Sequence, residues 1–468
     1  MEKLTFALFF GNRGFFPGEL IAGARTEIKN AVEAAGCETL IMNESLTRYG
    51  AVETVEEGKK FAAFLADNRG KYDGVILSLP NFGDETGAVA ALEDCGVPIF
   101  IQAYPDEIGK MDFANRRDSF CGKFSVMDVF YQYKLPFTTF KAHTVHPQSD
   151  EFAREIEQFS AVCRIVGGMK RFTVGAIGAR TTAFKTVRFD ELALQKHGIT
   201  TETYDLSDLI SRVRKYNTRK SQFKKKQEFL AAYTNWNGVP DEKFNLLCKA
   251  ACVLDDYITD YQLDALALRC WSELEIELGI APCVILSAIN DRGIAAACEL
   301  DVANAVSMRA LSLASEKPAT VLDWNNNYGD NPDKCILFHC GPVPQKLMTE
   351  KGQIIQHPMF VKSFGDGCGW GCNVGRISPN EMTFCSSKTE DGKLIFYTGE
   401  GRITDDPIER EFFGCAGVAE IPNLQTKLYN IGRNGFRHHV GMTPGFYEAA
   451  LKEAFKTYLG YEIFEIDN

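Results

Sequence analysis

The sequence lacks the glycine-rich fingerprints of nucleotide-binding folds. The loop Gly11–Gly18, which follows an apolar run, reads GNRGFFPG and fits neither GxGxxG nor GxxxxGK. Those patterns place phosphates of dinucleotides and nucleoside triphosphates against backbone N–H groups at a helix N-terminus. Their absence from this first strand–loop–helix segment speaks against a nucleotide as its ligand.

An excess of basic residues is also missing. The chain has 62 acidic and 51 basic residues and a net charge of −11, which argues against nucleic acid or an anionic membrane surface as the main partner. No segment has the length of a membrane span, and the N-terminal run MEKLTFALFF is too short for a signal-peptide core. We therefore expect a soluble, cytoplasmic protein.

Paired cysteine motifs are absent although cysteine is abundant. The chain has 15 cysteines and no CxxC pair, and its nearest approach to a metal motif is Cys368 and Cys372 in GCGWGC. That spacing among glycines is a poor match for a zinc site. Most other cysteines stand in apolar stretches, which indicates reduced thiols in a protein core.

The chain of 468 residues is too long for one core, and three domains are predicted. In residues 1–168 apolar strand-like runs alternate with helical periodicity, which indicates a parallel, doubly wound sheet, and residues 169–315 repeat the pattern. The predicted fold class is therefore α/β. Two Rossmann-like domains precede a mostly antiparallel β domain, residues 316–468, expected to form a small barrel with a C-terminal helix.

In the third domain, short strand-like runs are separated by glycine, proline and Asp/Asn turns. They include Gln353–Val361 and Lys427–Ile431, and Pro444–Leu459 then reads as an amphipathic helix.

Three residues near strand ends are candidate substrate contacts. Asn12 and Arg13 follow the first predicted strand and would lie at the ligand-facing edge of the sheet, although a solvated turn is the alternative. Trp271 follows the strand-like run Leu263–Leu268 and could form an apolar wall for a sugar face, with a core role as the alternative.

Two acids stand out because their surroundings are apolar. Apolar residues recur at helical spacing between Ile294 and Leu313, so we expect a helix that carries Glu299 on or beside its buried face. Asp323 is expected at the carboxyl end of a short buried strand, with Trp324–Tyr328 as the loop after it. Burying two unpaired carboxylates is costly, which predicts a cation or a proton between them, unless local caps or salt bridges satisfy each acid.

Histidines near strand ends supply the remaining candidate ligands. Of 7 histidines in the chain, His339 ends the run CILFHC, and His438 and His439 follow GRNGFR. A single histidine is more often structural, but neutral imidazole is also a common metal ligand. Two acids with two histidine sites suit Mn²⁺ or another divalent metal.

At these positions the sequence resembles the L-fucose isomerase and L-arabinose isomerase superfamily. The resemblance covers the whole chain and is carried by ACELDVANAVSM, TVLDWNNNYGD, FHCG and the late HHV. It implies that Glu299, Asp323, His339 and His439 hold the metal. Asp323 matches the fucose branch, where the arabinose branch has glutamate, whereas His339 is closer to the arabinose branch.

The resemblance implies an aldose–ketose isomerase that acts on an open-chain sugar through a cis-enediol. Glu299 and Asp323 would move the proton between C1 and C2. The substrate would be an aldohexose or aldopentose, L-fucose- or D-arabinose-like, or a sulfonated hexose such as sulfoquinovose. Asn12, Arg13, Trp271 and Asn325 are the expected substrate-binding residues.

The resemblance also implies a homo-oligomer, a trimer or hexamer, in which the first domain of a neighbouring subunit covers each site. The loop Gly11–Gly18 would do this here, and the polar connection around Arg116 could serve a further subunit contact. Two other functions stay open at this stage: a sugar-binding or regulatory homologue without catalysis, and a metal-dependent aldolase or hydrolase.

Overall fold

The computed structural model describes residues 3–181 and 183–467. The chain forms two compact units. The first comprises the chain up to Gly167 together with Glu453–Gly460, and the second comprises Gly168–Lys452 and the segment that begins at Tyr461. The second and third predicted domains both lie within the second unit, so their separation stays a prediction.

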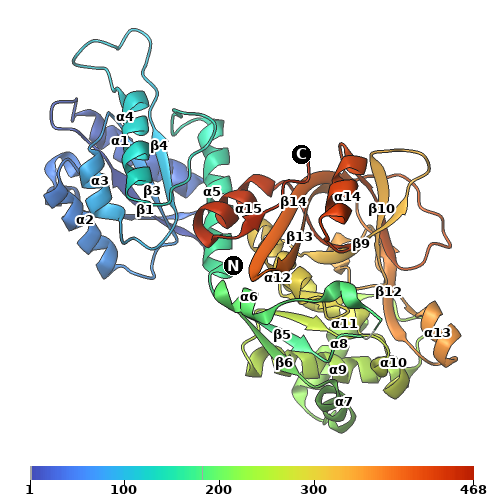
Figure 1. Ribbon diagram of the computed structural model, residues 1–468. Coiled ribbons are helices and arrows are strands. Elements are labelled where there is room, and N and C mark those ends of the chain that lie inside the picture. The colour runs from blue at the N-terminus through green and yellow to red at the C-terminus, as the bar shows by residue number, and fades with distance from the viewer. Residues whose placement is uncertain (1–2, 182, 468) are drawn as a thin grey trace. The chain divides into compact units, whose positions relative to one another are not determined.

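The first unit is an α/β layer structure around a parallel sheet (Figure 1). Its helices and strands are β1 (Thr5–Phe10), α1 (Leu20–Ala34), β2 (Glu38–Ile41), α2 (Val55–Asp67), β3 (Gly74–Leu79), α3 (Glu85–Leu92), β4 (Ile99–Ala103), α4 (Ser119–Gln132) and α5 (Asp150–Met169). Helix α5 runs into the second unit. The first unit also has 3₁₀ turns at Glu44–Leu46 and Arg48–Gly50 and a π-helix at Ala454–Leu459.

The four strands of this sheet run in the order β2-β1-β3-β4. Strands β1 and β3 are almost wholly buried because helices cover both sheet faces, which explains their continuous apolar sequences. Helix α5 packs on the sheet through aromatic rings. The Phe100 ring of β4 lies 6.1 Å from the Phe152 ring and 5.5 Å from the Phe159 ring.

The second unit contains a second parallel sheet, in the order β6-β5-β7-β8. Its elements are β5 (Phe172–Ile177), α6 (Glu191–Lys196), β6 (Ile199–Tyr204), α7 (Leu206–Lys215), α8 (Ser221–Tyr233), α9 (Asp241–Asp260), β7 (Ala265–Leu268), α10 (Glu273–Glu277), α11 (Cys283–Asn290), β8 (Ala295–Cys298) and α12 (Val302–Ser315), with a 3₁₀ turn at Lys185–Val187.

A nine-stranded, mostly antiparallel sheet completes the second unit, in the order β11-β12-β15-β10-β9-β16-β13-β14-β17. Strand β14 also pairs with β15, which closes a ring of strands β15, β10, β9, β16, β13 and β14. The elements are β9 (Thr320–Asn327), β10 (Lys334–His339), β11 (Gln353–Gln356), α13 (Pro358–Phe364), β12 (Trp370–Arg376), β13 (Asn380–Glu390), β14 (Lys393–Ile403), β15 (Cys415–Glu420), α14 (Leu424–Arg433), β16 (His439–Pro444), α15 (Glu448–Glu453) and β17 (Glu462–Ile463), with a 3₁₀ turn at Gln345–Leu347.

Helix α12 joins the two sheets of the second unit. It contacts β7 and β8 of the parallel sheet and β13 and β16 of the antiparallel sheet, and Figure 1 shows it between them. It is buried almost all round, which fits its position between two layers. Two parallel sheets and one large, mostly antiparallel sheet confirm the predicted mixed α/β class.

The helix predicted from Ile294 to Leu313 is wrong in its first part. Ala295–Cys298 is strand β8, which pairs with β7, and the helix begins only at Val302. Four small apolar residues in a row satisfy both a buried strand and one face of a buried helix, so apolar spacing alone does not separate them. Glu299 therefore lies in a strand-to-helix turn and not on a helix.

The predicted loop after Asp323 is also wrong. Strand β9 continues to Asn327, and Asp323 lies within it, paired with His439 of β16 and Phe338 of β10. The exposed asparagines that follow read as a loop by composition, but they keep pairing with β10. Backbone pairing has here overridden the residues' low strand propensity.

Three predictions in the C-terminal region also need correction. Lys427–Ile431 lies in helix α14 and not in a strand, and residues 358–361 begin helix α13, whose first residue is Pro358. Proline is favoured at this position because a helix's first N–H groups have no partner inside it. Pro444 ends strand β16, and the expected long helix is replaced by α15 and the π-helix.

Within residues 3–181 and 183–467, no helix combines the length and the apolar composition needed to cross a membrane.

Candidate metal and catalytic site

Glu299 is positioned by an unusual turn at the carboxyl end of strand β8. Glu299 and Leu300 have φ angles of 62° and 60°, in the left-handed region that non-glycine residues rarely adopt. The turn ends at Asp301, the N-cap of α12, whose side chain accepts a hydrogen bond from the Asn304 N–H at 3.1 Å. The acid pair Glu299 and Asp301 is thus fixed by backbone geometry and by a helix cap.

Three neighbouring strands of the antiparallel sheet supply the other residues. His439 begins β16 and lies directly opposite Asp323 of β9, so the two side chains meet on one face. On the other side of β9, Phe338 of β10 lies opposite Asp323, and His339 follows it.

The side chains of these strands converge on Glu299. The Nε2 atom of His439 lies 3.0 Å from Oε2 of Glu299 and 3.3 Å from Oδ1 of Asp323. One ligand atom each of Glu299, His339 and His439 lies within 4.8 Å of the others. His438 is more exposed, and its Nε2 lies 3.8 Å from Asp323. The structure thus brings together all four residues expected to hold a metal.

Two of the converging atoms lack a hydrogen-bond partner although they are buried. Oδ1 of Asp323 and Nε2 of His339 make no hydrogen bond to any described part of the chain. Unsatisfied buried polar atoms are rare in folded proteins because each one costs free energy. A divalent cation between these carboxylate and imidazole atoms would satisfy them, so the residues fit such an ion.

His439 is oriented by Asp301 and Arg437, which sequence reasoning missed. The Nδ1 atom of His439 lies 2.8 Å from Oδ2 of Asp301, and Asp301 also pairs with buried Arg437. Burial raises the pKa of Asp301, but Arg437 and His439 outweigh this effect and hold it well below its usual range. An ionised Asp301 keeps the Nδ1 proton of His439 and leaves Nε2 to face Glu299 and Asp323.

Two further pKa shifts at the site follow from burial and charge. Burial lowers the pKa of His439, but hydrogen bonds to Asp301 and Glu299 outweigh it and raise the value to about 10. Burial also raises the pKa of Asp323, and the charge of Glu299 adds to this effect while the histidines oppose it. Without a cation, a proton on His439 therefore balances part of the acidic charge.

His339 has a defined orientation. The backbone N–H of Cys340 donates a hydrogen bond to Nδ1 of His339 at 2.9 Å, so Nδ1 presents a lone pair. A neutral His339 therefore carries its proton on Nε2, the atom that faces the acids. To bind a cation through Nε2, the neutral ring must carry its proton on Nδ1 instead, and the hydrogen bond from the Cys340 N–H would then be lost.

Two of the expected substrate residues lie in the second unit. Trp271 packs against Phe184 with ring centroids 5.4 Å apart, and Phe184 in turn lies 5.6 Å from His439. Phe184, which sequence reasoning did not single out, thus links Trp271 to the metal-ligand candidates. Asn325 is exposed on β9 and donates a hydrogen bond to Asn326.

The other two expected substrate residues, Asn12 and Arg13, belong to the first unit. Asn12 is fully buried, and its amide donates to Glu53 and accepts from Asn81. Arg13 donates to the Gly83 carbonyl at 2.8 Å and also pairs with Glu85. Both residues therefore have partners within their own unit.

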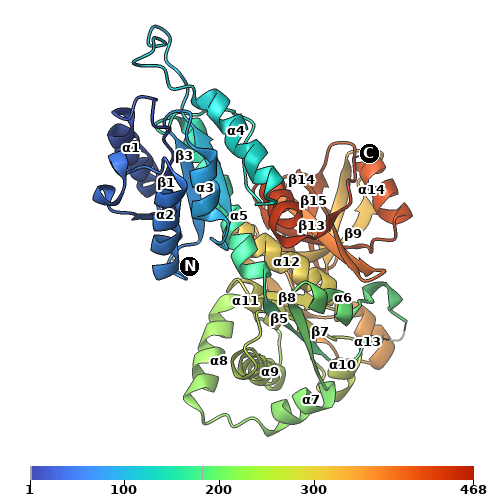
Figure 2. The same cartoon turned by 60° about the vertical axis from the view of Figure 1, so that its left-hand side comes forward.

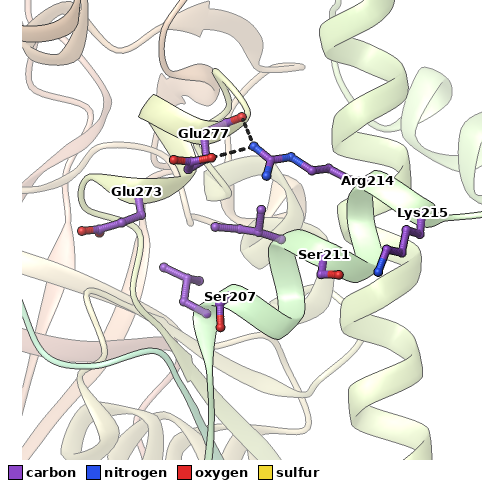
Figure 3. A pocket seen from close by; sticks show the side chains of 8 residues that line it. Ser207, Ser211, Arg214, Lys215, Glu273 and Glu277 are labelled. Carbon is purple, nitrogen blue, oxygen red and sulfur yellow. Dashed lines mark hydrogen bonds and ion pairs between the residues drawn. The ribbon is translucent and has the colours of Figure 1, made fainter.

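A separate cleft of about 490 Å³ lies between helices α7 and α10 (Figure 3). Leu206 and Ile210 line it, and Arg214 pairs with Glu277 across it at 2.6 Å. None of the expected ligands lines this cleft among the described residues. The other residues that line it are Ser207, Ser211, Lys215 and Glu273.

Comparison with known proteins places both ends of the chain in one enzyme family. Residues 7–170 match the domain family described as Fucose/sulfoquinovose isomerase, N-terminal domain. Residues 337–467 match the one described as L-fucose isomerase, C-terminal domain.

Curated relatives align over most of the chain. The sulfoquinovose isomerases of Priestia aryabhattai and Priestia megaterium are each 24% identical over 419 residues, which is 87% of this chain and 87% of each relative. The sulfoquinovose isomerase of Alkalicoccus urumqiensis is 23% identical over 344 residues, 72% of this chain and 74% of that protein. A solved ABC transporter solute-binding protein of Actinobacillus succinogenes 130z with bound D-allose aligns at 12% identity over 67% of this chain and 93% of its own. Its TM-score of 0.17 is too low to bear on the fold.

The matches at both ends and the relatives that span most of the sequence confirm the resemblance to this family. The chain belongs to the L-fucose isomerase-like family of aldose–ketose isomerases.

Proposed function

We propose that this protein is a metal-dependent isomerase that converts an open-chain aldose into the ketose through a cis-enediol. The observation that carries the proposal is the convergence of Glu299, Asp323, His339 and His439, with buried ligand atoms that have no other partner. Mn²⁺ or a similar divalent ion suits this mixture of carboxylate and imidazole donors.

A bound divalent cation would supply Lewis acidity, which polarises the sugar carbonyl and stabilises negative charge on the enediolate oxygens. Glu299 and Asp323 would move the proton between C1 and C2 of the sugar. Burial raises the pKa of Asp323, which shifts this carboxyl group toward the protonated form that a general acid requires. Asp301 and Arg437 hold His439 in the tautomer that leaves Nε2 free.

A sulfonated hexose is the substrate class that we favour. The curated relatives at 23–24% identity are named sulfoquinovose isomerases. The segment that carries Phe184 also carries Lys185 and Arg188, and the Arg188 carbonyl accepts a hydrogen bond from Arg437 at 3.3 Å. This segment therefore lies beside His439 and offers cationic groups for a sulfonate.

The direct test is an isomerisation assay on a sugar panel after chelation and metal replacement. Sulfoquinovose, its uncharged parent D-glucose, L-fucose and D-arabinose should be incubated with the chelated protein and then with added Mn²⁺. The proposal expects ketose formation from at least one sugar, dependent on the metal. Cleavage products, or turnover that survives complete chelation, would contradict it.

The proposal includes a homo-oligomer, a trimer or hexamer. The first unit exposes large apolar side chains on the loop between β4 and α4, with Ile108 97% and Phe113 84% exposed. Figure 2 shows this loop extending away from the sheet of its unit. Phe15 in the loop Gly11–Gly18 is also 72% exposed. Exposed apolar groups of this size support a contact with a second chain.

A further inference from the structure

Helix α12 carries a buried amide, Asn304, on its first turn. Asn304 is fully buried, and so are its apolar neighbours Ala303 and Ala305. A buried amide costs free energy unless its polar atoms have partners. The helix cap uses only the backbone N–H of Asn304, which donates to Asp301, so the cap does not need the amide side chain. The contacts of the side chain therefore indicate a role beyond capping.

The side chain of Asn304 connects the Asp301 carboxylate to His439. Its Nδ2 donates a hydrogen bond to Oδ2 of Asp301 at 2.6 Å and lies 3.5 Å from the carbonyl oxygen of His439. Oδ2 is the carboxylate oxygen that lies 2.8 Å from Nδ1 of His439. The other oxygen, Oδ1, is held by Arg437 and by the helix cap. Asn304 thus fixes the oxygen that orients the His439 ring.

Ser386 of β13 holds His439 from the neighbouring strand. The Ser386 hydroxyl lies 3.1 Å from Oδ1 of Asn304 and 3.0 Å from the carbonyl oxygen of His439, so its one proton is shared between two acceptors. Along the described strands, the last backbone pair between β13 and β16 is Cys385 with Gly441. The hydroxyl therefore takes over where backbone pairing stops, and it ties the His439 backbone to the amide that also holds Asp301.

We infer that Asn304 and Ser386 are positioning residues for His439. They hold its ring through Nδ1 and its backbone through the carbonyl oxygen, so that Nε2 faces Glu299 and Asp323. The inference rests on the proposed function, because it takes His439 as a metal ligand. Partners of this kind, which touch the ligand and not the metal, commonly contribute about 10- to 100-fold in metal affinity.

The competing explanation is that these polar groups only join helix α12 to strand β13. Ser307 and Ser387 show such a joint on the same two elements. Both are fully buried, their hydroxyls lie 3.1 Å apart, and Ser387 donates to the Ala303 carbonyl at 2.8 Å. Ser387 follows Ser386 directly and makes an equivalent hydrogen bond that does not involve His439. It is therefore the matched control.

The test is a titration of the chelated full chain with Mn²⁺ alone, in which electron paramagnetic resonance counts the free ion. Asn304→Ala and Ser386→Ala should each bind Mn²⁺ about 10- to 100-fold more weakly than the parent, and the two losses should not add in the double variant. Ser387→Ala should bind as the parent does. Equal weakening in Ser387→Ala and Ser386→Ala would overturn the inference, and parent-like affinity in either Asn304→Ala or Ser386→Ala would overturn it for that residue.

Low-field proton NMR of the metal-free protein separates this inference from the proposed function, because it needs neither metal nor sugar. The Nδ1 proton of His439 is identified by its loss in His439→Gln. It should exchange with solvent at least about tenfold faster in Asn304→Ala and Ser386→Ala than in the parent, and at the parent rate in Ser387→Ala.

If none of the proteins binds Mn²⁺, the proposed function fails while the exchange rates still decide the positioning role. If Asn304→Ala does not fold, Ser386→Ala supplies the result, because it removes a single hydroxyl. An exchange rate in Ser386→Ala equal to that of the parent would overturn the inference.

Discussion

Individual side chains at the site divide into those that would act on the sugar and those that hold others in place. Glu299 and Asp323 face the unpartnered atoms of the site, whereas Asp301 is saturated by Arg437, His439 and Asn304. Substitutions at Glu299 and Asp323 should therefore lower activity more than stability, whereas a substitution at Asp301 should lower the stability of the fold.

Glu299→Gln and Asp323→Asn should lower turnover at least about 100-fold, the lower bound for losing a general acid or base. The free energy of unfolding of the metal-free protein should change by less than about 1 kcal/mol, because removing one charge also relieves repulsion between the two acids. Steady-state kinetics and denaturant unfolding of the same samples measure both effects. A large loss of stability would mean that the acids serve the fold.

Asp301→Asn is the matched control for these substitutions. It leaves Arg437 buried without a counter-charge and should cost about 3 to 5 kcal/mol of folding stability. If this variant unfolds at the same denaturant midpoint as the parent protein, the account is contradicted, because Asp301 then contributes nothing to folding.

The raised pKa of His439 predicts how metal affinity depends on pH. Its value of about 10 in the metal-free protein lies above the unfolded value near 6.5. The stabilisation from protonated His439 is therefore fully present below about pH 6.5 and is lost as the pH rises through about 10. The cation must displace this proton, so the affinity for Mn²⁺ should rise by at least about tenfold per pH unit between about pH 6 and 8.

Titration calorimetry in buffers of different ionisation enthalpy checks this expectation, because it counts the protons released. Asp301→Asn removes the hydrogen bond that raises the pKa and should flatten the dependence. An affinity for Mn²⁺ that is constant over this range would contradict the assignment of His439 as a ligand.

The sequence predicts secondary-structure elements well where its pattern is compatible with only one type of element. The alternating strands and helices of the first unit follow from continuous apolar runs separated by amphipathic segments. The sequence predicts one helix where the structure has strand β8 and helix α12. The apolar run AAAC is compatible with either a buried strand or a buried helix, and no glycine marks the left-handed turn at Glu299 between them. Helix α14 was mistaken for a strand, since its short buried stripe contains few residues.

The candidate ligands could be predicted from sequence because strand ends and family motifs mark them. Asp301 and Arg437 could not, because their role depends on a contact between residues far apart in the chain. An acid two residues after Glu299, at the cap of a helix, was the available signal.

Helices α4 and α5 of the first unit each bury a charged residue. Lys123 and Glu155 are almost inaccessible, and their charges interact. Burial lowers the pKa of Lys123 to about 8 and raises that of Glu155 to about 7, with each charge opposing the shift of the other. Lys123→Met alone should destabilise the protein by about 3 to 5 kcal/mol, because Glu155 loses its counter-charge.

The double substitution Lys123→Met with Glu155→Leu should restore stability and exceed the parent by up to about 4 kcal/mol, because no buried charge remains. Denaturant unfolding of the parent, of Lys123→Met and Glu155→Leu alone, and of the double variant forms a complete double-mutant cycle. If the double variant were as unstable as the single one, the two charges would not form a pair.

Assembly is the property of the whole molecule on which the proposed site depends. Light scattering should find an oligomer of at least three chains. Arg13→Ala should raise KM several-fold while the metal stays bound, because Arg13 lies on the loop proposed to reach a neighbouring site. The control is Arg154→Ala, which removes an exposed arginine on helix α5 of the same unit and should leave KM unchanged.

Subunit exchange gives the stricter test of a shared site. Arg13→Ala protein mixed with Glu299→Gln protein should regain partial activity, since some hybrid sites combine an intact loop with an intact acid pair. A monomer by light scattering, or no recovery in mixtures that contain hybrids, would rule out the shared site.

The central claim is that Glu299 and Asp323 carry a proton transfer between neighbouring carbons of an open-chain sugar, with a divalent cation bound by these acids and His439. The most direct measurement is proton NMR of the sugar substrate incubated in D₂O with the Mn²⁺-loaded protein and then freed of metal. The account predicts deuterium at C1 of the ketose or C2 of the aldose, at a rate that Glu299→Gln reduces at least about 100-fold. Isomerisation without any exchange in Glu299→Gln and parent alike would indicate hydride transfer between C1 and C2 and would contradict the account.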